Sequence, residues 1–273
     1  MSRDAAAHAL LLDCEQVYST FTVPDDLRSD QTVEAYSNEI NQKKYVHMYF
    51  AKHVALWRRV RKHLKSTGAL WSIGAGPMLD IFGWFWDVPA SSEQKVVACD
   101  VLDWSPIRRL PSWQSLAATL AATHEYLAPV AVPDAADLPQ CANVPAAALP
   151  PSHVDDGATV LFPFVLNHVL GRNAPGGDAA RSALRSWAAD IVARHGTIVI
   201  ADLHVRKAPE FWKAVQQVLG LKNTRARTVN FADSIGDIAR LYPHEGHRRG
   251  HRNVATATVL VVRQAGARFF FSE

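Results

Sequence analysis

Apolar and aromatic side chains recur at every third or fourth position along residues 46–64, which is the spacing of one face of an α-helix. The positions on this face are Val46, Tyr49, Phe50, His53, Trp57, Val60 and Leu64. A short, continuous apolar run follows at residues 69–73. This change of pattern predicts a long helix that leads directly into the first strand of a sheet.

The rest of the chain alternates in the same way between short apolar runs and longer stretches of helical period. Strands are predicted at residues 69–73, 95–101, 158–164, 196–203 and 254–263, and helices at residues 78–85, 111–127, 178–194 and 208–219. A further, third strand is predicted within residues 129–149, where many Pro and Ala residues leave no clear period. Alternating strands and helices predict an α/β fold with a doubly wound, mostly parallel Rossmann-like sheet.

Composition is typical of a globular chain with a large core. The chain has 273 residues, of which 48% are hydrophobic, enough for one large domain or one domain with a helical addition. Because the helical stretch precedes the first strand, we expect an N-terminal helical cap over residues 1–66. We expect the Rossmann-like domain over residues 67–273.

Charge, cysteines and apolar runs exclude several classes of protein. A net charge of +3 is too small to require a polyanionic partner, and three cysteines without paired spacing indicate neither a disulfide framework nor a thiolate metal site. No apolar run approaches the roughly 18 residues that span a bilayer. The first four residues include Asp4 and lack the order of a signal peptide. We therefore expect a cytoplasmic protein without membrane contacts.

The most informative motif is the turn after the first predicted strand, Gly74-Ala75-Gly76-Pro77, together with Asp100 at the end of the second. A Gly-x-Gly turn lets backbone amides approach a ligand closely, and an acid at the end of the next strand suits the two hydroxyls of a ribose. The third glycine of the dinucleotide fingerprint is missing after Pro77. The motif favours a nucleoside ligand without phosphates over a nicotinamide dinucleotide.

In these residues the chain resembles the class I S-adenosylmethionine-dependent methyltransferases. The resemblance covers roughly residues 45–263 by pattern, with residues 73–77 as the glycine loop and Asp100 as the ribose acid. It implies S-adenosylmethionine as cofactor. The cofactor-binding residues that it implies on this chain are Gly74, Ala75, Gly76, Asp100, Val101, Phe162 and Pro163.

Within that superfamily, residues 100–104 with Trp113 downstream look similar to the small-molecule amine methyltransferases related to nicotinamide N-methyltransferase. That family also places tyrosines before the glycine loop, and Tyr45 and Tyr49 occupy such positions here. Together with Trp71 they are the nearby aromatic faces for a sulfonium cation. The chain departs from the family at Ser105, where the family has an asparagine.

Candidate acceptor-site residues follow the later strands. Residues 164–170 resemble the segment after the fourth strand in many small-molecule methyltransferases, and they contain Asn167 and His168. A histidine accepts a proton near neutral pH whereas an amide only orients, so His168 is the better candidate base. His204 is a candidate wall of the same pocket. The alternative for each histidine is a structural position at the end of a strand or under a helix.

Two basic clusters, at residues 58–65 and 243–252, leave an RNA methyltransferase open as an alternative. The three histidines of the second cluster match no zinc pattern, and Gly246 and Gly250 disfavour a helix there. We therefore expect no metal. The expected methyl acceptor is a small molecule, and the expected methylated atom is nitrogen or oxygen. A catalytically silent methyltransferase-like binding domain is the other alternative, and the oligomeric state stays open.

Overall fold

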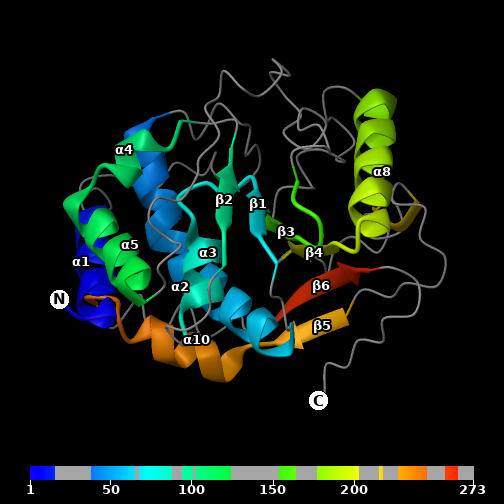
Figure 1. The fold of residues 1–273 in the computed structure, drawn as a ribbon. Helices are drawn as coiled ribbons and strands as arrows, with labels where there is room; N and C mark the ends of the chain where they lie inside the picture. Colours follow the sequence, from blue (N-terminus) through cyan, green and yellow to red (C-terminus); the bar gives the residue numbers. More distant parts are fainter. Residues whose placement is uncertain are drawn as a thin grey trace.

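The computed structural model describes residues 1–15, 38–64, 68–87, 94–100, 103–123, 154–163, 177–202, 215–217, 227–244 and 256–263. These residues contain a six-stranded sheet with the order β2-β1-β3-β4-β6-β5 (Figure 1). The strands are β1 (Leu70–Ile73), β2 (Val96–Cys99), β3 (Thr159–Pro163), β4 (Thr197–Asp202), β5 (Arg227–Asn230) and β6 (Thr256–Val262). The order places β1 and β3 in the interior of the sheet.

The sheet is mixed but mostly parallel. Strands β2, β1, β3 and β4 run parallel to one another, whereas β6 is antiparallel to both β4 and β5. Every side chain of β1 is buried, as expected for a parallel strand covered on both faces. The predicted α/β fold with a mostly parallel sheet and N-terminal helices is confirmed.

The described helices flank this sheet (Figure 1). They are α1 (Arg3–Glu15), α2 (Glu39–His63), α3 (Leu79–Phe85), α4 (Ser105–Arg108), α5 (Pro111–Thr123), α8 (Gly177–Ala193) and α10 (Ala232–Ala239). Helix α2 is the long helix predicted before the first strand. It begins earlier than the apolar stripe because the side chain of Asn38 accepts a hydrogen bond from Asn41 N–H and caps it.

Four elements were not predicted, and each carries a short or weak pattern. Strand β5 has one buried apolar side chain, Val229, among its described side chains, helix α4 is a single turn, and α10 and α1 show no long stripe. The strand predicted within residues 129–149 lies outside the described residues. Of the helix predicted at residues 208–219, residues 215–217 are described and are helical.

The core between α2, α3 and α10 is rich in aromatic residues. Trp57, Trp84, Phe50, Phe82 and Tyr242 are all fully or almost fully buried. The Tyr242 hydroxyl donates to the backbone carbonyl of His47 at 2.7 Å, so its polar end is satisfied inside the core. Within the described part of the chain, no helix is both long and apolar enough to cross a membrane.

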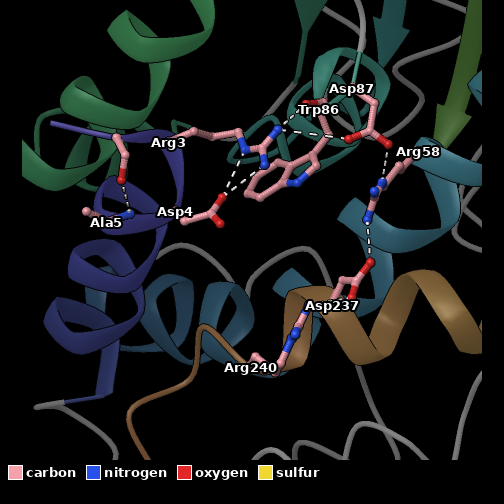
Figure 2. Close-up of polar contacts among 9 residues, drawn as sticks. Arg3, Asp4, Ala5, Arg58, Trp86, Asp87, Asp237 and Arg240 are labelled. Carbon is pink, nitrogen blue, oxygen red and sulfur yellow. Dashed lines mark hydrogen bonds and ion pairs between the residues drawn. The ribbon is translucent and has the colours of Figure 1, made fainter.

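A polar clasp, made of Arg3, Arg58, Asp87, Asp237 and Arg240, crosses the outer side of these helices (Figure 2). Arg58 of α2 pairs with Asp87, which follows α3, and with Asp237 of α10 at 3.4 Å. Arg3 of α1 donates to the carbonyl of Trp86 and lies over its ring at 4.4 Å. The clasp thus joins four elements that are distant in sequence.

Candidate functional site

The glycine loop connects the end of β1 to the start of α3 through backbone conformations that favour glycine. Gly74 has φ 73° and Gly76 has φ 53°, both in the left-handed region that is open to glycine without steric cost. Met78 also takes a positive φ, 65°, as the N-cap of α3. Because of that turn the helix begins at Leu79, two residues after Pro77 rather than at it.

The loop meets the predicted ribose acid directly. Gly76 N–H donates a hydrogen bond to Oδ2 of Asp100 at 2.6 Å. The contact follows from the topology, since β1 and β2 are adjacent and parallel and their carboxyl ends lie at one edge of the sheet. The two features on which the predicted cofactor site depends are therefore neighbours in space.

Two side chains from α4 and α5 clamp the loop from its other side. Arg108 Nη2 donates to the carbonyl of Gly76 at 2.7 Å, and Trp113 Nε1 donates to the carbonyl of Pro77 at 3.0 Å. Arg108 was missed by sequence reasoning, because nothing in its spacing connects it to the loop. The loop backbone is thus held at three successive points by β2, α4 and α5.

The short helix α4 is held in place by Asp103 and Gln42. Asp103 Oδ1 accepts from Ser105 N–H at 2.7 Å, and its other oxygen accepts from the Ser105 hydroxyl at 2.9 Å. These hydrogen bonds lower the pKa of Asp103. Gln42 of α2 donates to the Asp103 carbonyl at 2.7 Å. Ser105, where the resemblance has an asparagine, therefore donates two hydrogen bonds to Asp103 here.

An aromatic wall, made of Tyr45, Tyr49, His53 and Trp104, lies beside the loop. The ring centroids of Tyr45 and Tyr49 are 4.8 Å apart, and those of Tyr45 and Trp104 are 5.4 Å apart. A Cβ added to Gly76 would lie 3.5 Å from the Trp104 indole, so Trp104 connects the wall to the loop. Sequence reasoning selected both tyrosines but neither Trp104 nor His53 as site residues.

His53 is the buried member of the aromatic wall. Its Nε2 is 3.3 Å from the hydroxyl oxygen of Tyr45, and 4% of the residue is exposed. Burial, and secondarily the charge of Lys52, lowers the pKa of His53 to about 3. The imidazole is therefore neutral at physiological pH.

A buried carboxyl, Asp80, lies in the first turn of α3 directly after the loop. Its side chain accepts a hydrogen bond from the Ser72 hydroxyl of β1. Burial raises the pKa of Asp80 to about 7, against the opposing effect of hydrogen bonds from Ser72 and the backbone, and the charge of Asp100 raises it further. The signal in the sequence was a lone acid inside the apolar stretch that follows Pro77.

The remaining predicted cofactor residues divide into described and undescribed ones. Ala75 is buried in the loop, and Phe162 and Pro163 are at the carboxyl end of β3, the parallel neighbour of β1. They share the sheet edge of the loop and Asp100. Val101 lies outside the described residues, and so do the predicted acceptor-site residues Asn167, His168 and His204.

Trp71 does not belong to this edge. Its indole N–H donates to Oδ2 of Asp155 at 2.9 Å, and Asp155 precedes β3. The side chain therefore extends toward the amino end of the parallel strands, away from the glycine loop. The expectation that Trp71 offers an aromatic face to the cofactor is wrong in this geometry.

Two arginines of the first basic cluster are engaged in contacts within the protein. Arg58 belongs to the polar clasp, and Arg61 donates to the carbonyl of Leu64 at 2.6 Å while its guanidinium lies 5.3 Å from the Trp84 ring. Across the described ranges, no group of His, Cys, Asp and Glu side chains is arranged to hold a metal ion.

Comparisons with known proteins find neither a matching family model nor a matching curated protein. Solved structures do match, and a Burkholderia thailandensis protein bound to S-adenosylhomocysteine shares 11% identity over 98% of this chain and 95% of its own, with a TM-score of 0.49. The Streptomyces achromogenes O-methyltransferase TomG, in complex with S-adenosylmethionine, shares 12% identity over 94% and 90%, with a TM-score of 0.38.

A Haemonchus contortus phosphoethanolamine N-methyltransferase, in complex with phosphomonomethylethanolamine and S-adenosylhomocysteine, shares 9% identity over 85% of this chain and 58% of its own, with a TM-score of 0.43. Nothing in these comparisons supports the nicotinamide N-methyltransferase-like subgroup. Each of these solved structures is similar to this chain at 9–12% identity, with TM-scores of 0.38–0.49.

Proposed function

We propose that this protein is an S-adenosylmethionine-dependent methyltransferase that acts on nitrogen or oxygen of a small molecule. The observation that carries the proposal is the 2.6 Å hydrogen bond from Gly76 N–H to Asp100. It joins a tight glycine loop and a carboxylate at the carboxyl ends of adjacent parallel strands, where ligands of open α/β sheets bind. The incomplete phosphate-binding fingerprint after Pro77 favours a nucleoside over a dinucleotide at this place.

The residues present fit such a cofactor. Gly76 has a positive φ, which glycine adopts without steric cost, and its backbone N–H lies beside Asp100. In the proposal Asp100 accepts from the ribose hydroxyls, and the loop supplies backbone amides. The other residues proposed to contact the cofactor are Gly74, Ala75, Val101, Phe162, Pro163, Tyr45 and Tyr49.

In the proposed reaction the main task of the protein is to position the methyl donor and the acceptor. The bound cofactor supplies a methyl group on a sulfonium, which reacts by direct displacement. Holding two reactants in line is worth roughly 7–11 kcal/mol by effective-molarity arguments. We propose that His168 accepts a proton from the acceptor, and that Asn167 and His204 orient the acceptor.

We propose that the helical cap expected over residues 1–66 takes part in the site through α2, which carries Tyr45 and Tyr49. The engagement of Arg58 in the polar clasp and of Arg61 with Leu64 and Trp84 favours a small-molecule acceptor over RNA. An RNA enzyme needs cationic side chains that reach phosphates, and its affinity for RNA falls steeply with salt. We expect no such RNA binding.

The first prediction concerns Asp100. Calorimetric titration with S-adenosylhomocysteine should show binding to the wild-type protein, with no binding of NAD under the same conditions. The variant Asp100→Asn should bind S-adenosylhomocysteine about 1.5–3 kcal/mol more weakly, because hydrogen bonds to a charged acceptor are lost. That difference is roughly ten- to hundredfold in the dissociation constant.

Asp190→Asn is the matched control, since Asp190 lies on α8 and pairs with Arg194 at 2.7 Å. It should bind S-adenosylhomocysteine like the wild type. A wild-type protein that binds neither S-adenosylhomocysteine nor S-adenosylmethionine contradicts the proposed function. A folded Asp100→Asn variant with unchanged affinity shows instead that the cofactor site is elsewhere.

A further inference from the structure

Three members of the aromatic wall are four residues apart on α2. Tyr45, Tyr49 and His53 therefore share one face of the helix, each one turn from the next. Their ring centroids lie close together, at 4.8 Å for Tyr45 and Tyr49, 5.8 Å for Tyr45 and His53, and 6.0 Å for Tyr49 and His53, with the rings tilted or edge-on to one another. On this face the Tyr45 hydroxyl reaches Nε2 of His53, two turns further along the helix.

This group of three rings is buried at one end and partly exposed at the other. His53 is almost fully buried, whereas Tyr45 and Tyr49 are half-buried. Tyr45 also contacts Trp104, which in turn lies against Gly76 of the loop. The Tyr45 hydroxyl is thus held at 3.3 Å from the buried His53, and its ring contacts the residue that lies against the loop.

We propose that His53 is a positioning residue, which accepts the hydroxyl proton of Tyr45 in a hydrogen bond and leaves the phenolic oxygen as an acceptor for the cationic end of the methyl donor. The inference rests on the proposed function. His53 touches neither cofactor nor acceptor, and acts through Tyr45.

The side chains of the aromatic wall are of the kinds that attract a cation. Aromatic faces attract positive charge, and a phenol that donates its proton to a neighbour offers lone pairs to the other side. The adenine and ribose of the methyl donor are neutral, whereas its sulfonium and ammonium are positively charged. The aromatic wall should therefore favour ligands that carry these cationic groups over ligands that lack them. Asp100 serves the ribose and therefore does not supply this discrimination.

The protonation state of His53 is suited to this role. Its low pKa keeps one ring nitrogen available as an acceptor at every pH at which the protein is assayed. A charged imidazolium would have no acceptor nitrogen and would repel a cation. The neighbouring charged group, Lys52, has a pKa lowered by burial, and its Nζ lies 5.7 Å from the Tyr49 ring.

Three ligands separate the proposed role from a structural one. S-Adenosylmethionine carries both cationic groups, S-adenosylhomocysteine carries the ammonium alone, and 5′-methylthioadenosine carries neither. His53→Leu and Tyr45→Phe should each weaken S-adenosylmethionine binding about three- to twentyfold, as expected for one lost hydrogen bond. Both variants should bind 5′-methylthioadenosine within about twofold of the wild type, because adenine and ribose do not use the wall.

Two further variants sharpen the experiment. His53→Gln retains an acceptor oxygen and should recover most of the affinity for S-adenosylmethionine. The double variant Tyr45→Phe with His53→Leu should lose no more affinity than Tyr45→Phe alone, because both changes remove the same interaction. His63→Leu, at the last residue of α2, is the matched control and should leave all three affinities unchanged.

The outcomes are distinguishable. Equal losses for all three ligands in His53→Leu would show a structural role for His53, and unchanged affinity for S-adenosylmethionine would show no role. Either result overturns the inference about His53. The proposed function still stands in both cases if the wild-type protein binds the ligands. A wild-type protein that binds none of the three ligands overturns the proposed function itself.

Discussion

At the scale of single residues, Asp80 is a carboxyl that is buried together with the apolar residues around it in α3. Its carboxyl is buried beside Ser72, and burial raises its pKa to about 7. The folded protein therefore binds a proton at Asp80 more tightly than the unfolded chain. The free energy of unfolding should fall as pH rises from about 4 to about 7, and should level off above that range.

The variant Asp80→Asn has no titrating group at this position, so it tests the contribution of Asp80 to the pH dependence of stability. The unfolding free energy of the variant relative to the wild type should increase between pH 4 and pH 8, by up to about 4 kcal/mol from the pKa shift. The measurement is urea unfolding at several pH values, with Asp190→Asn as the control. A constant difference between variant and wild type across this range would contradict the raised pKa of Asp80.

At the scale of elements, the packing of α3 on α2 depends on one position. A Cβ added to Gly83 would lie 2.6 Å from the carbonyl oxygen of Val54 and 2.9 Å from Cβ of Trp57. Because backbone atoms of α2 cannot move aside locally, Gly83→Ala should destabilise the protein by about 1–3 kcal/mol. The measurement is the midpoint of thermal or urea unfolding.

Gly236 provides the matched control for that substitution. It also lies inside a helix, α10, but a Cβ there meets nothing within 4 Å. Gly236→Ala should therefore stabilise the protein by about 0.5–1 kcal/mol, because alanine loses less backbone freedom in a helix. Similar effects of the two substitutions would mean that the close approach of α2 and α3 is absent in solution.

At the scale of the whole molecule, the polar clasp joins helices that belong to distant parts of the chain. Arg58 is 16% exposed and pairs with carboxylates from two other elements. A double-mutant cycle of Arg58→Ala and Asp87→Ala should give a coupling free energy of about 0.5–1 kcal/mol. In 1 M salt the coupling should fall, because the screening length is then about 3 Å.

The cycle of Lys62→Ala with Asp87→Ala is the comparison, since Lys62 is more exposed and its Nζ is 3.4 Å from Asp87. Its coupling should be smaller than that of Arg58. Equal coupling for both cationic partners, or coupling that persists in 1 M salt, would show that the two-sided contact of Arg58 does not contribute as proposed.

The sequence by itself determined the α/β class, the strands around the glycine loop and the long helix before them. Their apolar periods are strong and local, and Gly76 and Asp100 stand at recognisable positions after strands. Short elements such as β5 and α4 carry too few apolar positions to produce a period, so sequence reasoning missed them.

Only the tertiary structure decided which side chains meet at the loop. Arg108 and Trp104 contact Gly76, and His53 contacts Tyr45, although their spacing in the sequence bears no relation to these distances. The same holds for Trp71, whose strand leads into the loop but whose indole contacts Asp155 instead. Periodicity reports which face of an element is buried, whereas the partners on that face are set by how the elements pack.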